Sequence, residues 1–189
     1  AVLVAAASIG GYFALRDDTQ NSATDDGDPA TEGPPGSFAS PYPFGKVVVV
    51  YYNDEATKEQ RRWVIQVLAP VVDATQQLVG AGTASAPGQG EVLAQIRVRI
   101  TYQSGPEPGS LSDLRFKAVG AAPGTVFDAA VACPAAAPLD EAAQVTVLDS
   151  AEGDLCWRIP QGELVTLKLA VEAEAADGTV HMELNAPAG

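Results

Sequence analysis

The segment from Glu91 to Gln103 alternates between apolar and polar side chains, and no other feature constrains the fold as strongly. Its apolar positions share one parity and are Val92, Ala94, Ile96, Val98, Ile100 and Tyr102. Its polar positions share the other parity and are Gln95, Arg97, Arg99, Thr101 and Gln103. Because successive side chains of a strand point to opposite faces, the segment is predicted to be a strand with one buried and one solvated face.

Shorter strand candidates surround this segment. They cover residues 47–52, 63–68, 114–118, 126–131, 144–148, 155–159, 165–171 and 180–184. Turn signals such as Gly105-Pro106, Pro123-Gly124 and Asp177-Gly178 separate them, and residues 57–62 are expected to form a turn or hairpin tip. Residues 71–79 offer only a short helix. About seven to nine short strands with almost no helix predict an all-β antiparallel sandwich or barrel.

The chain divides by composition into three parts. Residues 1–15 are apolar or small and carry no charge, so residues 1–16 are predicted to be the remnant of a signal-anchor helix; a signal peptide or a buried segment are the alternatives. Residues 17–43 are rich in Pro, Gly, Ser and Thr, with six acids and no base between 17 and 40, which predicts a disordered linker. Residues 44–187 are predicted to be the folded domain.

Charge and residue counts exclude several classes of function. The 189 residues carry a formal net charge of −13 with only 11 Lys and Arg, which argues against nucleic acid as a partner. One His and two Cys exclude a dense zinc or iron–sulfur site, and we expect no cofactor and no metal. The acidic residues after residue 16 favour an extracytoplasmic location for the rest of the chain, either anchored or secreted.

The two cysteines are Cys133 and Cys156. An even count in an exported domain predicts one disulfide, which would close a loop of about 22 residues and contribute about 3 kcal/mol. Two alternatives stay open at this stage. The cysteines could be buried free thiols, or one could be a nucleophile with His181 as its base.

Four cations form the candidate interaction face, because they occupy the polar parity of two predicted strands: Arg97, Arg99, Arg115 and Lys117. The alternative is a solvated face with cross-strand pairing to acids. Trp63 and Trp157 are expected in the core. Paired carboxylates such as Glu152/Asp154 and Glu172/Glu174 are interpreted as solubilising charge. His181 shares its parity with Thr179 and Glu183, which predicts a solvent-facing side chain.

Several short segments resemble the actinobacterial, extracytoplasmic, telokin-like group of immunoglobulin-like domains, to which a secreted mycobacterial immunoglobulin-like antigen is distantly similar. They are Tyr42-Pro43-Phe44-Gly45, Trp63-Val64-Ile65-Gln66-Val67, Pro70, Asp73-Ala74-Thr75, residues 87–90, Arg99-Ile100-Thr101-Tyr102, Cys133, residues 153–160 and Leu167-Lys168-Leu169. The resemblance covers about three quarters of the chain. It implies an immunoglobulin-like β-sandwich, export, a disulfide between the two cysteines, and no catalytic residues.

The expected function is therefore a non-catalytic, extracytoplasmic interaction module of the cell envelope. A protein partner in the envelope, such as the other subunits of a membrane complex, is expected. Two other classes stay open. A carrier would hold a small apolar ligand or lipid in a cleft between the sheets, and an enzyme would place polar groups around His181 in a pocket.

Overall fold

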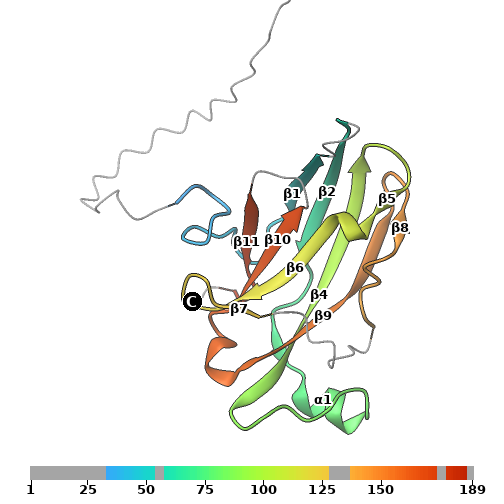
Figure 1. Ribbon diagram of the computed structural model, residues 1–189. Coiled ribbons are helices and arrows are strands. Elements are labelled where there is room, and N and C mark those ends of the chain that lie inside the picture. The colour runs from blue at the N-terminus through green and yellow to red at the C-terminus, as the bar shows by residue number, and fades with distance from the viewer. Residues whose placement is uncertain (1–32, 54–57, 128–136, 174–177, 187–189) are drawn as a thin grey trace, which may run out of the picture. The chain divides into compact units, whose positions relative to one another are not determined.

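Strand β4 (Glu91–Ser104) is the longest strand of the protein and the one that the alternating pattern predicts (Figure 1). We describe the fold from a computed structural model, which describes residues 33–53, 58–127, 137–173 and 178–186. These residues belong to one unit, Thr31–Gly189. The described part is mostly β, with antiparallel sheets and one short helix, so the predicted all-β class is confirmed at that level.

The larger sheet has five strands built around β4. Strands β1 (Val48–Asn53), β2 (Gln60–Val67) and β3 (Val72–Asp73) give the order β1-β2-β4-β3. Strand β9 (Ser150–Pro160) pairs with β4 along eleven register positions, from Glu91 opposite Pro160 to Thr101 opposite Ser150. All of these pairings are antiparallel, and β1 lies at an edge of the sheet.

The second sheet has four strands in the order β11-β10-β6-β7. They are β6 (Leu114–Val119), β7 (Val126–Phe127), β10 (Lys168–Ala173) and β11 (Thr179–Glu183). A pair of two-residue strands, β5 (Gly109–Ser110) and β8 (Gln144–Val145), forms a third, small sheet. The 3₁₀ turns Leu111–Asp113 and Gln161–Glu163 precede β6 and follow β9.

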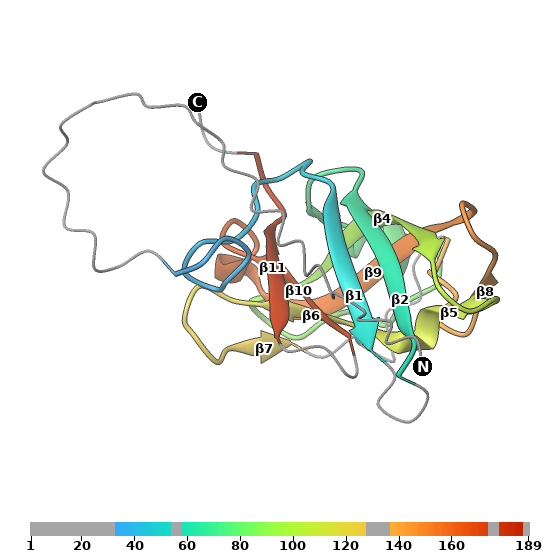
Figure 2. The same ribbon diagram turned by 90° about the horizontal axis from the view of Figure 1, so that it is seen from above.

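One continuous core lies between the two large sheets, which Figure 2 shows from above. The inward parity of β4, from Val92 to Tyr102, is buried as predicted. Trp63 and Trp157 have no exposed surface, and the Trp63 ring stacks on Tyr102 with 4.6 Å between ring centroids. The smaller sheet adds residues such as Leu169 to the same cluster. The expected core position of both tryptophans is therefore confirmed.

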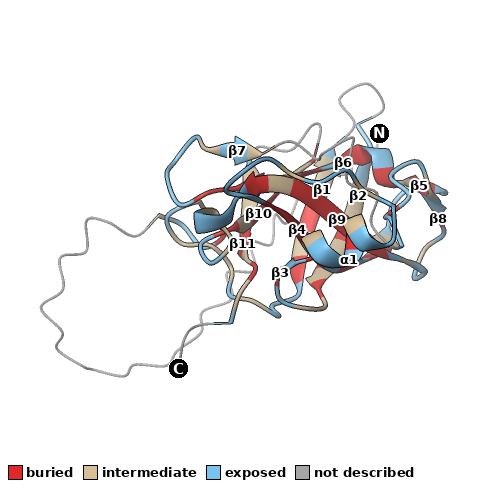
Figure 3. Ribbon diagram, turned by 90° about the horizontal axis from the view of Figure 1, so that it is seen from below, coloured by how far each residue is buried: buried red, intermediate tan, exposed pale blue. Residues whose placement is uncertain are grey.

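The helix α1 (Thr75–Gly80) covers one end of the outer face of the larger sheet, as Figure 3 shows by burial. Under it lies a second apolar cluster of Ala74, Leu78, Leu93 and Cys156. Leu93 occupies the outward parity of β4, and this cover explains why an apolar residue is found there. At the other end of β4, where no helix covers the outer face, Arg97 and Arg99 are exposed.

The strand boundaries differ from the prediction at several places. Strand β9 begins at Ser150 and not at residue 155, and β8 ends at Val145 and not at residue 148. Strand β2 begins at Gln60, inside the segment predicted as a hairpin tip, because its polar residues pair with β1. Strand β10 begins at Lys168, and Val165 before it is 78% exposed, so the predicted start at residue 165 is wrong. Strand β7 covers Val126–Phe127, and residues 128–131 of that prediction lie outside the described residues.

Candidate functional site

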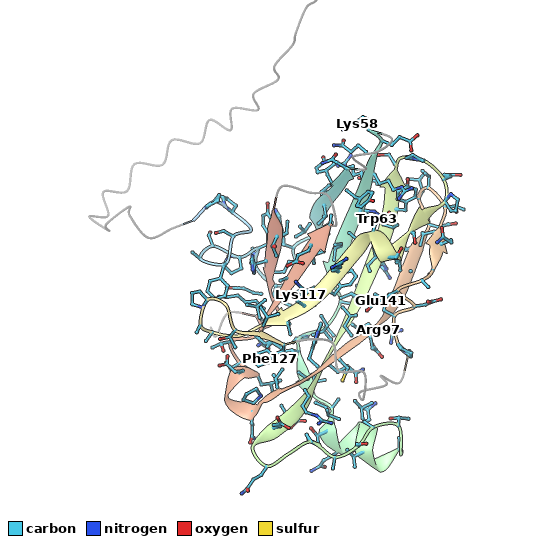
Figure 4. All side chains as sticks on the ribbon, viewed as in Figure 1. Lys58, Trp63, Arg97, Lys117, Phe127 and Glu141 are labelled. Carbon is cyan, nitrogen blue, oxygen red and sulfur yellow. The ribbon has the colours of Figure 1, made fainter. Side chains whose placement is uncertain are left out.

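The four predicted interaction residues lie in two different sheets. Arg97 and Arg99 belong to β4 of the larger sheet, and Arg115 and Lys117 belong to β6 of the smaller one. Figure 4 labels Arg97 and Lys117. All four take the outward parity that the alternation predicts, since their neighbours in sequence are core residues. The structure therefore offers two separate basic pairs, and each must be judged in its own surroundings.

On the smaller sheet, Lys117 is neutralised by an acid of the neighbouring strand. Its Nζ lies 2.8 Å from Glu172 Oε2 on β10, and Glu172 is also the register partner of Arg115. This arrangement is the cross-strand pairing that the sequence analysis gave as the alternative. The positive charge on this face is thus offset within the sheet.

On the larger sheet, the two arginines differ. Arg99 Nη2 lies 2.5 Å from Glu152 Oε1 on β9, and both side chains are substantially exposed. Arg97 is also exposed, but it forms no hydrogen bond and no ion pair within the described residues. Arg97 is therefore an exposed cation without an ion pair among the described residues, although Asp154 lies opposite it in the register of β9.

The outward side chains around Arg97 form a continuous surface, which we name the open face. It consists of Val49, Tyr51, Arg62, Val64, Gln66, Arg97, Arg99, Thr101 and Glu152, from β1, β2, β4 and β9. Tyr51 is 43% exposed, and the guanidinium carbon of Arg62 lies 6.0 Å from the centre of its ring. Sequence reasoning missed both residues. The alternation in the Val47–Tyr52 run could have predicted Tyr51 on the outer face of the sheet, near the cations of a neighbouring strand.

The outer face of the smaller sheet is partly covered by residues 33–44, which we name the strap. The Tyr42 N–H donates to the His181 carbonyl at 2.9 Å, and the Glu183 N–H donates to the Tyr42 carbonyl at 2.8 Å. The Phe38 ring lies 3.9 Å from Lys168 Nζ. The sequence analysis assigns residues 33–43 to the linker, and here they pair with β11, while residues 17–32 lie outside the described part of the chain.

His181 lies under the strap. Its ring meets the Phe38 ring edge-on, with 5.7 Å between centroids, and the backbone N–H of His181 donates to the Gly36 carbonyl at 2.7 Å. It shares its face with Thr179 and Glu183 as predicted, but it is half-buried where a solvent-facing side chain was expected. Burial lowers the pKa of His181, and the nearby Lys168 lowers it further.

The distance between the two cysteines is not described, because Cys133 lies outside the described residues. Cys156 is in β9 with outward parity, buried under α1 beside Leu93. The predicted disulfide therefore stays a prediction at this point.

The surface of the described chain has several hollows. One of about 430 Å³ lies beside Val165 and Asn185, and one of about 440 Å³ lies between β1, the strap and the start of β11. A third, of about 290 Å³, lies beside Arg97. None of these three is lined by His181.

The described residues contain no group of three or more His, Cys, Asp or Glu placed to hold a metal ion. Among the same residues, no helix has the length and apolar character needed to cross a membrane.

Comparison of the chain with protein-family models, with curated proteins and with solved structures finds no match. The assignment of a function therefore depends on the geometry of the chain itself, and above all on the open face.

Proposed function

We propose that the protein is a non-catalytic binding module that docks a partner protein on the open face. The observation that carries this proposal is Arg97, an exposed arginine on a solvated sheet surface that forms no ion pair with any described residue. The proposed partner is a protein with an acidic surface, because the open face carries three arginines, Arg62, Arg97 and Arg99, against the one exposed acid Glu152.

Charge complementarity supports this choice of partner. The whole chain has a formal net charge of −13, so a local excess of cations on one face is a departure from the rest of its surface. Such a patch steers an acidic partner toward one orientation and repels wrong ones. The desolvation that a bound partner imposes also strengthens the attraction of Arg97 for a carboxylate.

The residue types of the open face support docking as well. Tyr and Arg are enriched at protein interfaces and among the residues that dominate binding energy. Tyr51 offers a large exposed ring, and Arg62 is held over that ring. A flat strand surface with half-buried Val64 beside these residues provides apolar area at the centre and charge around it.

The proposal includes an immunoglobulin-like β-sandwich as the fold and an extracytoplasmic location, anchored through residues 1–16 or secreted. Two antiparallel sheets that share one core support the sandwich. The resemblance to telokin-like domains supports both the sandwich and the location. In this arrangement the acidic residues 17–32 would serve as the tether between a membrane and the domain.

A disulfide between Cys133 and Cys156 is part of the same proposal. Ala137 exchanges backbone contacts with Asp154, whose N–H donates to the Ala137 carbonyl at 2.7 Å. Cys133 lies four positions before Ala137 in sequence, and Cys156 lies two positions after Asp154, so the chain length allows the pairing. Alkylation of protein from an oxidising compartment should modify thiols only after reduction; two thiols modified without reductant would contradict the pairing.

The docking proposal is tested by site-specific photo-crosslinking in intact cells. A crosslinking residue at Thr101 reports on the open face, and one at exposed Val165 is the matched control position. We expect Thr101 to capture a specific partner whose yield falls about tenfold with Arg97→Glu and also falls at raised salt. Arg115→Glu, on the other sheet, should leave the yield unchanged. Equal capture from both positions, or capture that ignores Arg97→Glu, would refute the proposal.

A further inference from the structure

The hollow beside Arg97 has the charges and the size of a small-ligand site, and we propose that it binds a free α-amino acid with an aliphatic side chain. We name this hollow the socket. It has a volume of about 290 Å³, and the residues that matter for its chemistry are Pro70, Val72, Gln95, Arg97 and Asp154. The inference goes beyond the proposed docking function and does not depend on any protein partner.

Two opposite charges face each other across the socket without pairing. Arg97 on β4 and Asp154 on β9 are register partners, and both have outward parity. Side chains at such positions start about 5 Å apart at their Cβ atoms. No Arg97 nitrogen lies within the 4.0 Å that defines an ion pair with an Asp154 oxygen. A small molecule that carries both charges can therefore bridge them.

The carboxylate of Asp154 lacks hydrogen-bond donors. Its residue is only 6% exposed, yet the single donor to its side chain is the Ala137 N–H, at 3.3 Å from Oδ2. Oδ1 receives no hydrogen bond from the described residues. Asp154 lines the socket, and neither of its carboxylate oxygens is among the buried side-chain atoms without a partner. Oδ1 is therefore an acceptor that a molecule in the socket can reach.

Gln95 lines the same hollow, but its Oε1 is buried with no accessible surface, so a molecule in the socket does not contact that oxygen. Gln95 and Arg97 are two residues apart on β4, so their side chains leave the same face of the sheet. The socket thus combines one carboxylate oxygen that has no donor with one cation that has no ion pair, both among the described residues.

An α-amino acid supplies the missing groups in one molecule. Its ammonium has N–H donors for the Asp154 carboxylate, and its carboxylate matches the planar guanidinium of Arg97 in a two-bond geometry. Pro70 and half-exposed Val72 offer an apolar wall for an aliphatic side chain. The volume lies at the lower end of the range for small-molecule clefts, which limits the ligand to a few heavy atoms.

The test uses the purified full-length chain and isothermal titration with three probes. Leucine carries both charged groups, 4-methylpentanoate lacks the ammonium, and 3-methylbutylamine lacks the carboxylate. We expect saturable binding of leucine and at least about tenfold weaker binding of each single-charge analogue, because each leaves one side of the socket unpaired. If leucine does not saturate at millimolar concentrations, or if either analogue binds equally well, the proposal is overturned.

Variants then assign the binding to the socket. Arg97→Gln and Asp154→Asn should each weaken leucine binding at least about tenfold, and Arg99→Gln, two residues away on the same face, should not. Because Asp154 is buried, its substitution could also disturb the fold, so a second variant is made at an exposed position. Val72→Glu at the exposed rim puts a charge into the apolar wall that the aliphatic side chain of the ligand would contact, and it should also weaken binding. Unchanged affinity in Arg97→Gln or in Val72→Glu would refute the assignment.

Discussion

The outer faces of the two sheets differ in how far they are covered and in how their cations are paired. The face of the larger sheet stays open over β1, β2 and the second half of β4, and Arg97 on it is unpaired within the described residues. The face of the smaller sheet carries the ion pair of Lys117 with Glu172 and is partly covered by the strap through Phe38. A sheet surface becomes available for binding where the chain neither neutralises nor covers it, and the alternation of residues alone does not decide this.

The same contrast occurs within β4, and it gives the largest expected effect on stability. Leu93 and Arg97 have the same outward parity, but α1 buries Leu93 completely. Leu93→Ala should lower the free energy of unfolding by about 2–5 kcal/mol, because it leaves a cavity under the helix. The half-buried Val64 on the open face is the control, and Val64→Ala should cost about 1 kcal/mol or less. Denaturant unfolding measures both; equal losses would mean that α1 does not seal this end of the sheet.

Sequence patterns predicted which face of a strand a side chain points to better than they predicted which other segments pack over that face. The inward parity of β4 and the outward direction of Arg97, Arg99, Arg115 and Lys117 follow from a period of two. The assignment of these cations to two sheets could not be predicted, because it depends on β4 pairing with β9 and on β6 pairing with β10. Those contacts join residues 49 to 69 positions apart.

The sequence also did not predict that loops bury Asp154 and His181. Asp154 was expected to be a solubilising acid of a wet face, but it is buried and accepts a hydrogen bond from the Ala137 N–H. His181 was expected in solvent, but Phe38, more than 140 positions earlier, packs on its ring. In both cases local periodicity places the residue on the correct face, and a distant segment then covers it.

The strap provides the next largest effect. Gly36 has φ +83°, and a Cβ there would lie 2.6 Å from the Tyr42 ring, so Gly36→Ala cannot fit without movement of the strap. We expect hydrogen exchange of the Glu183 amide, which donates to the Tyr42 carbonyl, to speed up about tenfold or more. Gly45 is the matched control, since it has φ +80° with no atom within 4 Å of its Cβ position. If Gly45→Ala speeds exchange equally, backbone conformation and not the Tyr42 contact is responsible.

Acidification should loosen the strap by a smaller amount. With the strap packed against β11, the pKa of His181 lies below its ordinary value, chiefly because of burial and also because of Lys168. Glu172 and the backbone groups of Gly36 and Thr179 act in the opposite direction. The packed state of the strap therefore favours neutral His181. Its stability is fully present above the ordinary pKa of about 6.5, and it is lost as the pH falls through the lowered value.

This pH dependence has a simple control, because His181 is the one histidine of the chain. Exchange of the Tyr42 amide, which donates to the His181 carbonyl, should be faster at about pH 5 than at about pH 8 after correction for the intrinsic rate. His181→Gln should remove the difference. A pH dependence that persists in His181→Gln would assign the effect to other groups.

The smallest effects concern the ion pairs on the two faces. Arg99 with Glu152 is substantially exposed, and Lys117 with Glu172 is about one third exposed on each side. Exposed pairs contribute about 0–1 kcal/mol, so Arg99→Met and Lys117→Met should each change the free energy of unfolding by less than about 1 kcal/mol. The second loss should be the larger, because water screens that pair less. Double-mutant cycles with Glu152→Gln and Glu172→Gln measure the two coupling energies. If the coupling energy of the Arg99 pair proves the larger, then Glu152 occupies Arg99 on the open face. Of the two described cations of β4, only Arg97 would then be available to a partner.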